Sequence, residues 1–439
     1  MDVNQDGFLN TVLGSGLMSR DPFRHFRFSP DRMIDDTECA SLYTYNGIAR
    51  RIISAPADEA VKRGFSLKNN GVELEESAAV KSVFEDLEGE ERFSRALSWD
   101  RLYGGAVVLI VADDGAADLS EPLREDRLRK IERLCVYEAP EVYTSEWYAY
   151  DDPRDIKYGQ PEFYQISGYF GGNFLVHESR LLIFHGDPLP VDQRRMRNGW
   201  GAKVYERIFA DLMRYDESLS LGLMALSRLS QGVLKLSGLA DLLSYKDGEK
   251  IVQKRLQMID MARHMMNTLA LNQDDEYDQK NLSLSGVKDI LEEFQTALAA
   301  VTEIPVTVLF GRSPGGLNAT GKADFENFYN LVQRIQRRTL RPQLSRLIEL
   351  IGKCRDYRIR LPDSYTLEFE PLWSPTEKEQ AETRNILAQA EKNKADARVA
   401  LVNTGALDSM ELRDKLEEEG EYKLDRSLDK EAEGDGDAE

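Results

Sequence analysis

Residues 304–323 read IPVTVLFGRSPGGLNATGKA, a short apolar segment followed by a glycine-rich loop at Gly311–Gly321. Ile304-Pro305 ends the helix that apolar spacing predicts over Gly286–Glu303, because a residue before proline is driven out of the helical conformation. After the loop, apolar side chains recur every three or four residues and predict a long helix over Lys322–Ile351. The loop is therefore held between helices, and its glycines supply the backbone turns that it needs.

The helix after the loop carries two further features. Pro342 removes a backbone donor and clashes with the preceding turn, so we expect a kink near Thr339–Arg341. A basic stripe on the side opposite the apolar residues consists of Arg334, Arg337, Arg338 and Arg341. Such a stripe binds either the acidic surface of a neighbouring subunit or phosphate groups, and the sequence leaves both alternatives open.

A second long helix is predicted upstream, where apolar residues repeat at threes and fours over Val204–Leu229, which implies a length of about 40 Å. Between the two helical regions we expect a compact insertion. It comprises a strand at Val233–Leu236, a small helical section through Met266, a strand at Thr268–Leu271 and a polar loop at Asn272–Lys280. Two helices thus bracket a small subdomain.

The first two hundred residues mix strands and helices. Ala106–Ala112 is an apolar run between Gly104-Gly105 and an acidic turn, which predicts a buried strand. A helix is predicted over Glu121–Leu134, since Leu123, Leu128, Ile131 and Leu134 approximate one helical face. Prolines then separate short predicted strands at Phe163–Ser167 and Leu181–His185.

The C-terminal part is polar. Tyr365–Glu370 is a predicted strand, and Thr376–Glu419 is a predicted helical hairpin or bundle broken at Gly405. From Glu417 to Glu439 the chain has eleven acidic and three basic residues, a net charge of 3 − 11 = −8, and we expect this tail to be disordered.

The composition excludes several classes of protein. The 439 residues are 41% hydrophobic and 31% charged, with a net charge of −20, which argues against non-specific coating of nucleic acid. The three distant cysteines, Cys39, Cys135 and Cys354, predict neither disulfides nor a zinc site, and favour folding in the cytosol. The longest apolar run is too short to span a membrane, and the acidic N-terminus does not resemble an export signal.

Two motifs in the loop resemble catalytic ones and fail on a physical point. Gly311–Gly315 matches G-x-S-x-G, but the residue after the serine is Pro314, which has no N–H for an oxyanion hole. Gly316–Lys322 matches G-x-x-x-x-G-K, the phosphate-binding loop, but Ala323 lacks the hydroxyl that binds magnesium and no aspartate-ended strand follows. Nucleotide binding by this loop remains the alternative hypothesis.

No metal, cofactor or catalytic residue is predicted. Asp2, Asn4 and Asp6 start like a calcium loop whose twelfth position is Leu13 rather than glutamate. Four histidines, at positions 25, 177, 185 and 264, show no metal-binding spacing. His177 and His185 flank a predicted strand, and we expect them to be hydrogen-bonded at its ends. The acidic residues are spread over helical faces and do not form the carboxylate cluster that a nuclease would need.

A family resemblance rests on the quoted segment together with Phe328-Tyr329 and LRPQLSRLIEL at 340–350. These residues resemble the signature region of portal proteins, the head–tail connectors of tailed double-stranded DNA bacteriophages. Further matches follow in the same order over residues 40–350. They are Leu42-Tyr43, Ile48–Pro56, LYGGA at 102–106, Tyr158–Gln165, His177–Gly186 and Gly199–Gly201. Gly405–Leu416 resembles the helical unit that closes many portal chains.

The resemblance implies a helix-rich α+β portal fold with wing, stem, clip and crown, assembled as a ring, usually of twelve subunits, around a central channel. The implied division is an N-terminal arm at 1–40, an α/β wing at 41–200, a stem helix at 201–230, a clip at 231–285, a second stem helix at 286–310, a tunnel loop at 311–321, a kinked helix completing the wing at 322–373, crown helices at 374–419 and an acidic tail at 420–439.

The implied function is mechanical rather than enzymatic. The ring would sit at one capsid vertex of the virion, after assembly in the host cytoplasm, and pass double-stranded DNA during packaging and ejection. Its implied partners are terminase, head–tail adaptor proteins, and the major capsid and scaffold proteins, with no membrane. The DNA-facing residues of the tunnel loop would be Arg312, Ser313, Asn318, Thr320 and Lys322. Lys322 departs from the acidic or polar residue expected there.

Overall fold

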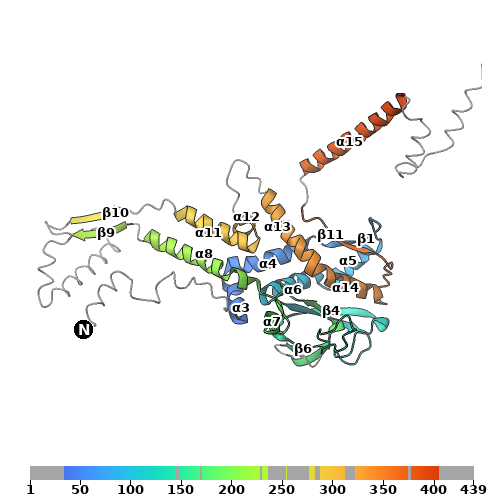
Figure 1. Cartoon of the computed structure of the whole chain (residues 1–439). Helices are drawn as coiled ribbons and strands as arrows, with labels where there is room; N and C mark the ends of the chain where they lie inside the picture. The colour runs from blue at the N-terminus through green and yellow to red at the C-terminus, as the bar shows by residue number, and fades with distance from the viewer. Residues whose placement is uncertain are drawn as a thin grey trace, which may run out of the picture. The chain divides into compact units, whose positions relative to one another are not determined.

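The structure is a computed structural model of the whole chain (Figure 1). It describes residues 34–144, 149–168, 171–227, 230–235, 254, 276–281, 287–311, 322–373 and 377–404. The chain divides into two compact units between Glu370 and Pro371. The second unit contains one described helix, α15 (Glu377–Asn403). The elements described below belong to the first unit.

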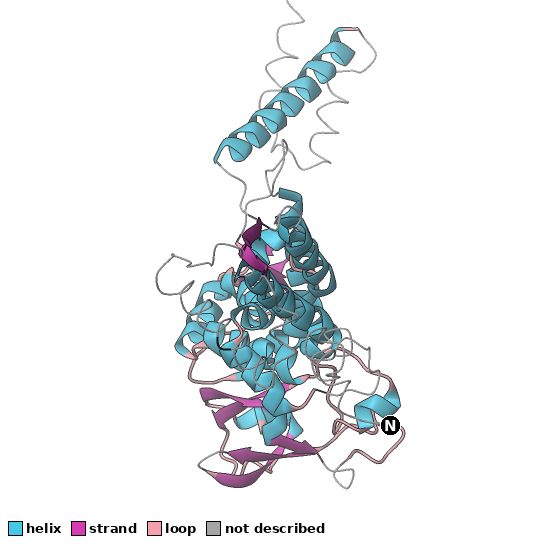
Figure 2. Cartoon of the chain, turned by 90° about the vertical axis from the view of Figure 1, so that its left-hand side faces the viewer, coloured by secondary structure: helices cyan, strands magenta, loops and turns pink. Residues whose placement is uncertain are grey.

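Two three-stranded antiparallel sheets lie at one end of the first unit, with helices against them (Figure 2). The first has the order β4-β3-β8, from β3 (Ala106–Asp113), β4 (Lys130–Glu138) and β8 (Leu181–Phe184). The second has the order β5-β6-β7, from β5 (Val142–Thr144), β6 (Phe163–Gly168) and β7 (Gly172–His177). The predicted strands at 106–112, 163–167 and 181–185 are confirmed within one or two residues.

Strand β3 is buried on both faces, as its unbroken apolar sequence predicts. Val107 and Leu109 join a core with Ile166 and Val176 of the second sheet. The alternate residues on its other face are buried as well, and helices α6 (Gly89–Tyr103) and α14 (Arg341–Lys353) contact this sheet. Apolar burial on two sides therefore makes β3 the centre of the first unit.

Four N-terminal helices precede β3, and of these α6 contacts the first sheet. They are α3 (Asp36–Tyr45), α4 (Gly47–Lys62), α5 (Glu76–Asp86) and α6 (Gly89–Tyr103). The third sheet has the order β11-β1-β2, from β1 (Phe65–Asn69), β2 (Val72–Glu73) and β11 (Thr366–Phe369). Pairing of Phe65 with Phe369 joins segments from opposite ends of the unit.

A long helical pair leaves this body. Helix α8 (Val204–Ser227) and helix α11 (Val287–Thr302) pack side by side and run in opposite directions (Figure 1). They are joined through a two-stranded ribbon of β9 (Ser230–Lys235) and β10 (Glu276–Asn281). The predicted pair of helices bracketing an insertion is confirmed, while the expected strand at Thr268–Leu271 and the helical section before it lie outside the described residues.

One prediction in this region is wrong. Residues 272–280 were expected to be a loop, yet 276–280 belong to β10, because backbone pairing with β9 forms a strand from EYDQKN without apolar alternation. The helix predicted over 286–303 is confirmed by α11, and α12 (Val306–Phe310) is a separate helix within the span 286–310 that the resemblance assigns to the second stem helix. Glu303 has a left-handed φ of 58° and Pro305 starts the new helix, so the helical path is broken between them.

The helix predicted over 121–134 is also wrong. The segment holds a short 3-10 turn, η2 (Glu125–Arg127), and then β4. Ile131 and Leu134 are both buried although they are three residues apart, because a bulge at Glu132 inserts one residue opposite the Val111/Ala112 step of β3. The bulge gives a strand the spacing of a helix, and the Tyr357 hydroxyl holds it by donating to the Ile131 carbonyl (2.9 Å) and accepting from the Ile131 N–H.

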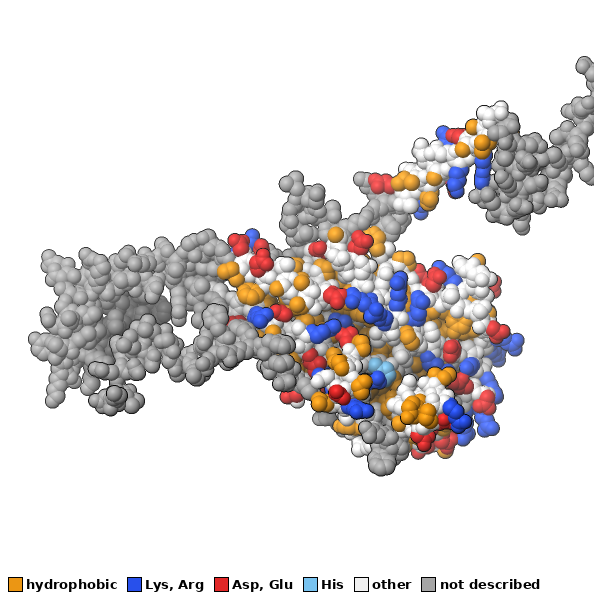
Figure 3. Space-filling view, viewed as in Figure 1, with side chains coloured by type: hydrophobic (Ala, Val, Ile, Leu, Met, Phe, Trp, Pro, Cys, Tyr) orange, Lys and Arg blue, Asp and Glu red, His pale blue; other side chains and the backbone are white. Residues whose placement is uncertain are grey.

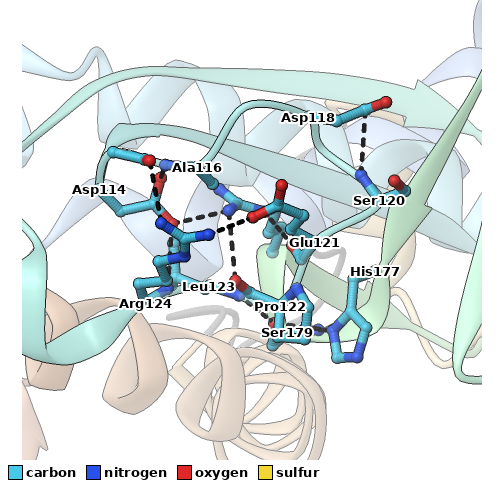
Figure 4. Close-up of polar contacts among 12 residues, drawn as sticks. Asp114, Ala116, Asp118, Ser120, Glu121, Pro122, Leu123, Arg124, His177 and Ser179 are labelled. Carbon is cyan, nitrogen blue, oxygen red and sulfur yellow. Dashed lines mark hydrogen bonds and ion pairs between the residues drawn. The ribbon is translucent and has the colours of Figure 1, made fainter.

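The connection between β3 and β4 is pinned by a buried ion pair (Figure 4). Arg180 and Asp114 are 1% and 3% exposed, and their N–O distance is 2.6 Å. Arg180 also donates to the Glu121 carbonyl (2.7 Å), while Asp114 accepts from the Arg124 N–H (3.0 Å). Because both charges are paired and further hydrogen-bonded, these contacts hold the loop in place although it forms no α-helix.

Three glycines mark a backbone junction where α6, β8 and α8 meet. A Cβ on Gly104 would lie 2.3 Å from the Gly201 oxygen, and a Cβ on Gly186 would lie 2.5 Å from the Gly104 oxygen. The Gly201 N–H donates to the Gly104 carbonyl at 2.8 Å. Gly104 and Gly186 also have φ of 77° and 66°. This glycine junction (Gly104, Gly186, Gly201) brings together three segments of the family resemblance, LYGGA, 177–186 and 199–201.

Asp100 supports the junction from α6. Its carboxylate accepts the Gly186 N–H at 2.5 Å, and the side chain is buried. Burial raises the pKa of Asp100 to about 7, although the Gly186 hydrogen bond and nearby Arg101 oppose the rise. His185, beside Gly186, packs on the Trp200 ring, and burial lowers its pKa to about 4.

We predict that Gly104→Ala destabilises the chain by about 3 kcal/mol or more, because the new Cβ meets backbone that has no room to move. Gly159→Ala is the matched control. Gly159 has almost the same φ, 75°, with nothing within 4 Å of a new Cβ, so it should lose only about 1 kcal/mol. Urea unfolding followed by circular dichroism measures both, and equal losses would contradict the close backbone contact.

The Asp100 pKa predicts a pH dependence of stability. The folded-state pKa of about 7 exceeds the ordinary value of 3.8, so the native state binds more protons in that interval and loses stability as pH rises through it. Asp100→Asn keeps an oxygen for the Gly186 N–H and does not titrate. We expect the free energy of unfolding of the wild type, minus that of Asp100→Asn, to fall as pH rises from about 4 to about 7 and to level off above.

The control for this effect is Asp100→Ala, which leaves the Gly186 N–H without its acceptor. It should be less stable than Asp100→Asn by about 1–3 kcal/mol at each pH. Urea titrations at several pH values measure all three chains. Parallel profiles for the wild type and Asp100→Asn would show that Asp100 does not titrate in this interval.

Candidate functional site

The two ends of the glycine-rich loop are held by helices. Helix α12 ends at Gly311, whose φ of 68° is the left-handed conformation that glycine adopts most easily at a helix end. Helix α13 (Lys322–Ile335) begins directly after the loop. The loop itself lies outside the described residues, and so do four of the predicted DNA-facing residues, Arg312, Ser313, Asn318 and Thr320. Lys322 is the first residue of α13.

The turn that leads into the loop is fixed by side chains. The Thr302 hydroxyl donates to the Leu298 carbonyl (2.8 Å) and accepts the Ile304 N–H (3.3 Å), while Leu298 and Ile304 are fully buried. Arg334 of α13 forms an ion pair with Glu303 at this turn. Helix α12 is further held by contact of its Phe310 ring with Tyr215 of α8, at 5.3 Å between centroids. Both ends of the loop therefore have defined positions.

Helix α12 bears on the nucleotide-binding alternative. A phosphate-binding loop follows a strand, so that its backbone N–H groups converge between the strand and the next helix. Here the apolar segment Val306–Phe310 is helical. Together with Ala323, where the magnesium-binding hydroxyl would be, this removes the structural context of the motif.

The helix after the loop is interrupted where a kink is predicted. A π-helical turn, η6 (Gln336–Leu340), joins α13 to α14 (Arg341–Lys353), and Pro342 stands in the first turn of α14. A π turn accommodates the donor that proline lacks. Buried Gln336 uses the turn to donate its side-chain N–H to the Ala60 carbonyl of α4, at 2.8 Å.

The four arginines of the predicted stripe are all exposed. Figure 3 shows Lys and Arg side chains gathered on the surface in the region of α13 and α14. They differ in their partners. Arg334 binds Glu303, and the Arg341 guanidinium lies 5.8 Å from the centre of the Phe369 ring. Arg337 and Arg338 form no ion pair within the described part of the chain.

A surface groove of about 1080 Å³ lies between the outer sides of α4, α5 and α6. Its lining includes the aromatic Tyr43, Phe84 and Trp99, the acidic Glu85, Glu88, Glu90 and Glu91, and the basic Arg50, Lys62, Arg63, Lys81 and Arg95. Arg101 fixes the two main helices together. It donates to the Ile52 carbonyl (2.9 Å), which Pro56 leaves without its helical partner, and to the Ile53 carbonyl (3.1 Å).

Sequence analysis did not find this groove. The glutamates before α6 carry a local signal, because acidic residues favour the first turn of a helix. Nothing in that signal indicates that the outer side of α6 faces the outer side of α4, some forty residues away. Pairing of the helices through Arg101 creates the groove, and this pairing becomes visible only in the structure.

The two histidines that flank β8, His177 and His185, make contacts that support the fold. His177 at the end of β7 accepts the Ser179 N–H through Nδ1 and lies 2.8 Å from the Ser179 hydroxyl (Figure 4). Ser179 in turn accepts the Leu123 N–H at 2.8 Å. His177 is thus hydrogen-bonded as predicted, whereas the contact of His185 is with the Trp200 ring. In the described ranges no group of three or more His, Cys, Asp or Glu residues is placed to hold a metal ion.

All three cysteines are free, and Cys39 and Cys354 are buried. Among the described helices, none has the length and apolar character needed to cross a membrane.

One family model covers most of the chain. The model of the phage portal protein family matches residues 37–393. An uncharacterized protein of Haemophilus influenzae is 28% identical over 389 residues, which are 88% of this chain and 84% of that protein.

Two further relatives are named anti-CBASS protein Acb1. The one from Caulobacter sp. is 27% identical over 411 residues, which are 90% of this chain and 64% of the relative. The one from Sphingomonas paeninsulae is 23% identical over 437 residues, or 97% and 67% of the two chains. The chain thus spans about two thirds of the length of these two relatives.

Two solved structures have a related course of the backbone. One is titled as the neck of an empty GTA particle, with a TM-score of 0.49 and 14% identity over 84% of this chain and 93% of that one. The other is titled as the virion of a native gene transfer agent particle, with a TM-score of 0.46 and 13% identity over 82% and 89% of the two chains.

The contact between η6 and α4 yields a prediction. Gln336→Leu fills the same space but leaves the Ala60 carbonyl without its donor, so the free energy of unfolding should fall by about 1–3 kcal/mol. Gln333→Leu is the matched control, because Gln333 is exposed on the same helix and should change stability by less than about 0.5 kcal/mol. Chemical unfolding measures both, and equal effects would contradict a stabilising role for the Gln336 bond.

Proposed function

The chain belongs to the phage portal protein family, and on that premise we propose that its copies assemble into a ring whose central channel carries double-stranded DNA into and out of a capsid. The observation that supports this most is a set of apolar side chains left in solvent on the long helical pair and on α13. They are Leu219 (39% exposed), Ile290 (58%), Val301 (43%) and Phe325 (37%).

The apolar stripe of α11 is only partly covered by the rest of the chain. On α11, Leu298 is buried against the rest of the chain, while Ile290 and Val301 at the edge of the same apolar stripe remain in water. The stripe is wider than a single chain covers. Exposed apolar surface of this kind is characteristic of protein contacts, and neighbouring copies in a ring would bury it.

We propose the division of the chain that the resemblance implies. The helices at 201–230 and 286–302 serve as the stem, the ribbon between them as part of the clip, and residues 41–200 as the wing. Helix α12 is then a separate link between the stem and the tunnel loop at 311–321. The arm, the crown helices at 374–419 and the acidic tail keep the boundaries given above.

In this proposal the tunnel loop touches DNA. Its two ends are held by α12 and α13. Arg312 and Lys322 would contact phosphates, with Ser313, Asn318 and Thr320 as neutral neighbours. The net charge of −20 suits sliding, because a mostly acidic wall repels phosphate, whereas a strongly basic wall would retain it.

The ring would act as a passive conduit and valve at one vertex of the virion. During packaging it would dock terminase, and later head–tail adaptor proteins, through the clip. Capsid and scaffold proteins would surround the wing during assembly in the host cytoplasm. This role requires no catalytic residue and no cofactor.

The name of the two longer relatives, anti-CBASS protein Acb1, is not carried to this chain. The portal family model accounts for residues 37–393 here, and about one third of each relative has no counterpart in this chain. The alternative of a nucleotide-binding packaging motor has the match at Gly316–Lys322 in its favour and the helical α12 against it.

The proposal predicts the native mass. Purified full-length chain, measured by mass photometry at moderate salt, should form a species of about twelve chain masses, and negative-stain images should show an annulus with a central hole. A chain that remains monomeric at each salt and protein concentration would contradict the ring. ATP binding that is abolished by Lys322→Ala would instead favour the nucleotide-binding alternative, with Arg312→Ala as the control for loss of one positive charge.

A further inference from the structure

Arg337 and Arg338 are exposed on the π turn η6, whose inner side is packed against the rest of the chain. Gln336, directly before them, is buried and bonded to the Ala60 carbonyl, and Leu340 just beyond them is also buried. The π turn is thereby fixed on its inner side, so its two outward guanidinium groups have a defined place. No carboxylate among the described residues pairs with either one, although the chain carries 77 acidic residues.

The basic pair, Arg337 and Arg338, does not line the groove between α4 and α6. On α4, Arg50, Ser54, Asp58 and Val61 recur at helical spacing and line the groove. Ala60 of α4 is buried, and its carbonyl accepts the Gln336 bond from η6. The basic pair and the groove are therefore separate surface features.

The groove is lined by both acidic and basic side chains, and two of the acidic ones, Glu85 and Glu90, differ from the rest in their partners. Glu88 and Glu91 are bonded to Arg92 and Arg95 within α6. Glu85 and Glu90 are exposed and form no ion pair with any other described residue. Two unpaired carboxylates at the groove thus match two unpaired guanidiniums on η6.

We propose that Arg337 and Arg338 of one copy bind Glu85 and Glu90 at the groove of the next copy. This inference rests on the proposed ring and names a contact within it. A ring closes through heterologous contacts, in which one patch of each chain binds a different patch of its neighbour, and the basic pair on η6 and the groove are two such patches. Guanidinium groups suit this role because they pair with carboxylates through two parallel hydrogen bonds.

The same arginines could instead contact DNA phosphates, and a charge exchange separates the two cases. In the full-length chain, Arg337→Glu with Arg338→Glu should place like charges opposite Glu85 and Glu90 and raise the protein concentration needed for half-assembly at least about tenfold. Glu85→Arg with Glu90→Arg should have the same effect. The chain with all four changes restores opposite charges and should assemble within about threefold of the wild type.

The control reverses charge elsewhere. Arg154→Glu with Arg127→Glu makes the same change in net charge at exposed positions, where the side chains are 90% and 65% accessible, and should leave half-assembly unchanged. Mass photometry over a range of protein and salt concentrations measures ring formation. Circular dichroism confirms that each chain is folded, as expected for substitutions of exposed side chains.

The outcomes separate this inference from the ring itself. If the variant with Arg337 and Arg338 reversed forms rings as readily as the wild type, the contact is overturned and the ring proposal stays intact. Rings that persist but retain less DNA would assign the pair to phosphate. Loss of rings that the fourfold exchange does not restore would overturn the pairing with Glu85 and Glu90. A wild-type chain that forms no ring would overturn the proposed function and this contact with it.

Discussion

Direct backbone contact among Gly104, Gly186 and Gly201 is the constraint around which the first unit is arranged. A Cβ at any of the three would lie within 2.5 Å of a backbone oxygen, so the separation of the segments is set by main-chain atoms and the Gly201–Gly104 hydrogen bond. Helix α8 starts just after this junction and extends about 36 Å from it. A change of about 10° at the junction would move the far end of the helix by about 6 Å.

Side-chain hydrogen bonds between distant elements fix the helices that flank the glycine-rich loop. Arg101 binds α4 to α6, Gln336 binds η6 to α4, and Gln343 of α14 accepts the Ile183 N–H of β8 at 3.2 Å. Each bond joins elements that lie far apart in the chain and satisfies a backbone group that would otherwise lack a partner. The helix after the loop and the helix pair before it are therefore both held in position relative to the same sheet.

The sequence predicted the elements whose signal is local. The apolar repeats of α8, α11 and α13–α14 and the apolar run of β3 each follow from one short stretch, and Pro342 indicated the interruption now seen as a π turn. The errors arise where pairing with a distant segment determines the secondary structure. Pairing with β9 makes a strand of polar β10, and the bulge at Glu132 gives β4 the spacing of a helix. The basic stripe was found because its residues share one helix, whereas the groove depends on two helices and on Arg101.

Charge limits how identical copies of this chain can meet. At a net charge of −20 each, neighbours repel, yet ions screen that repulsion beyond about 8 Å at physiological salt. Contacts within that distance therefore decide whether copies associate, and they need opposite charges or buried apolar surface. The described part of the chain has both, in Arg337 and Arg338 of η6, which pair with no described carboxylate, and in the exposed Ile290 and Val301 of α11. A surface of uniform charge would keep such chains apart, and η6 is a local departure from that acidity.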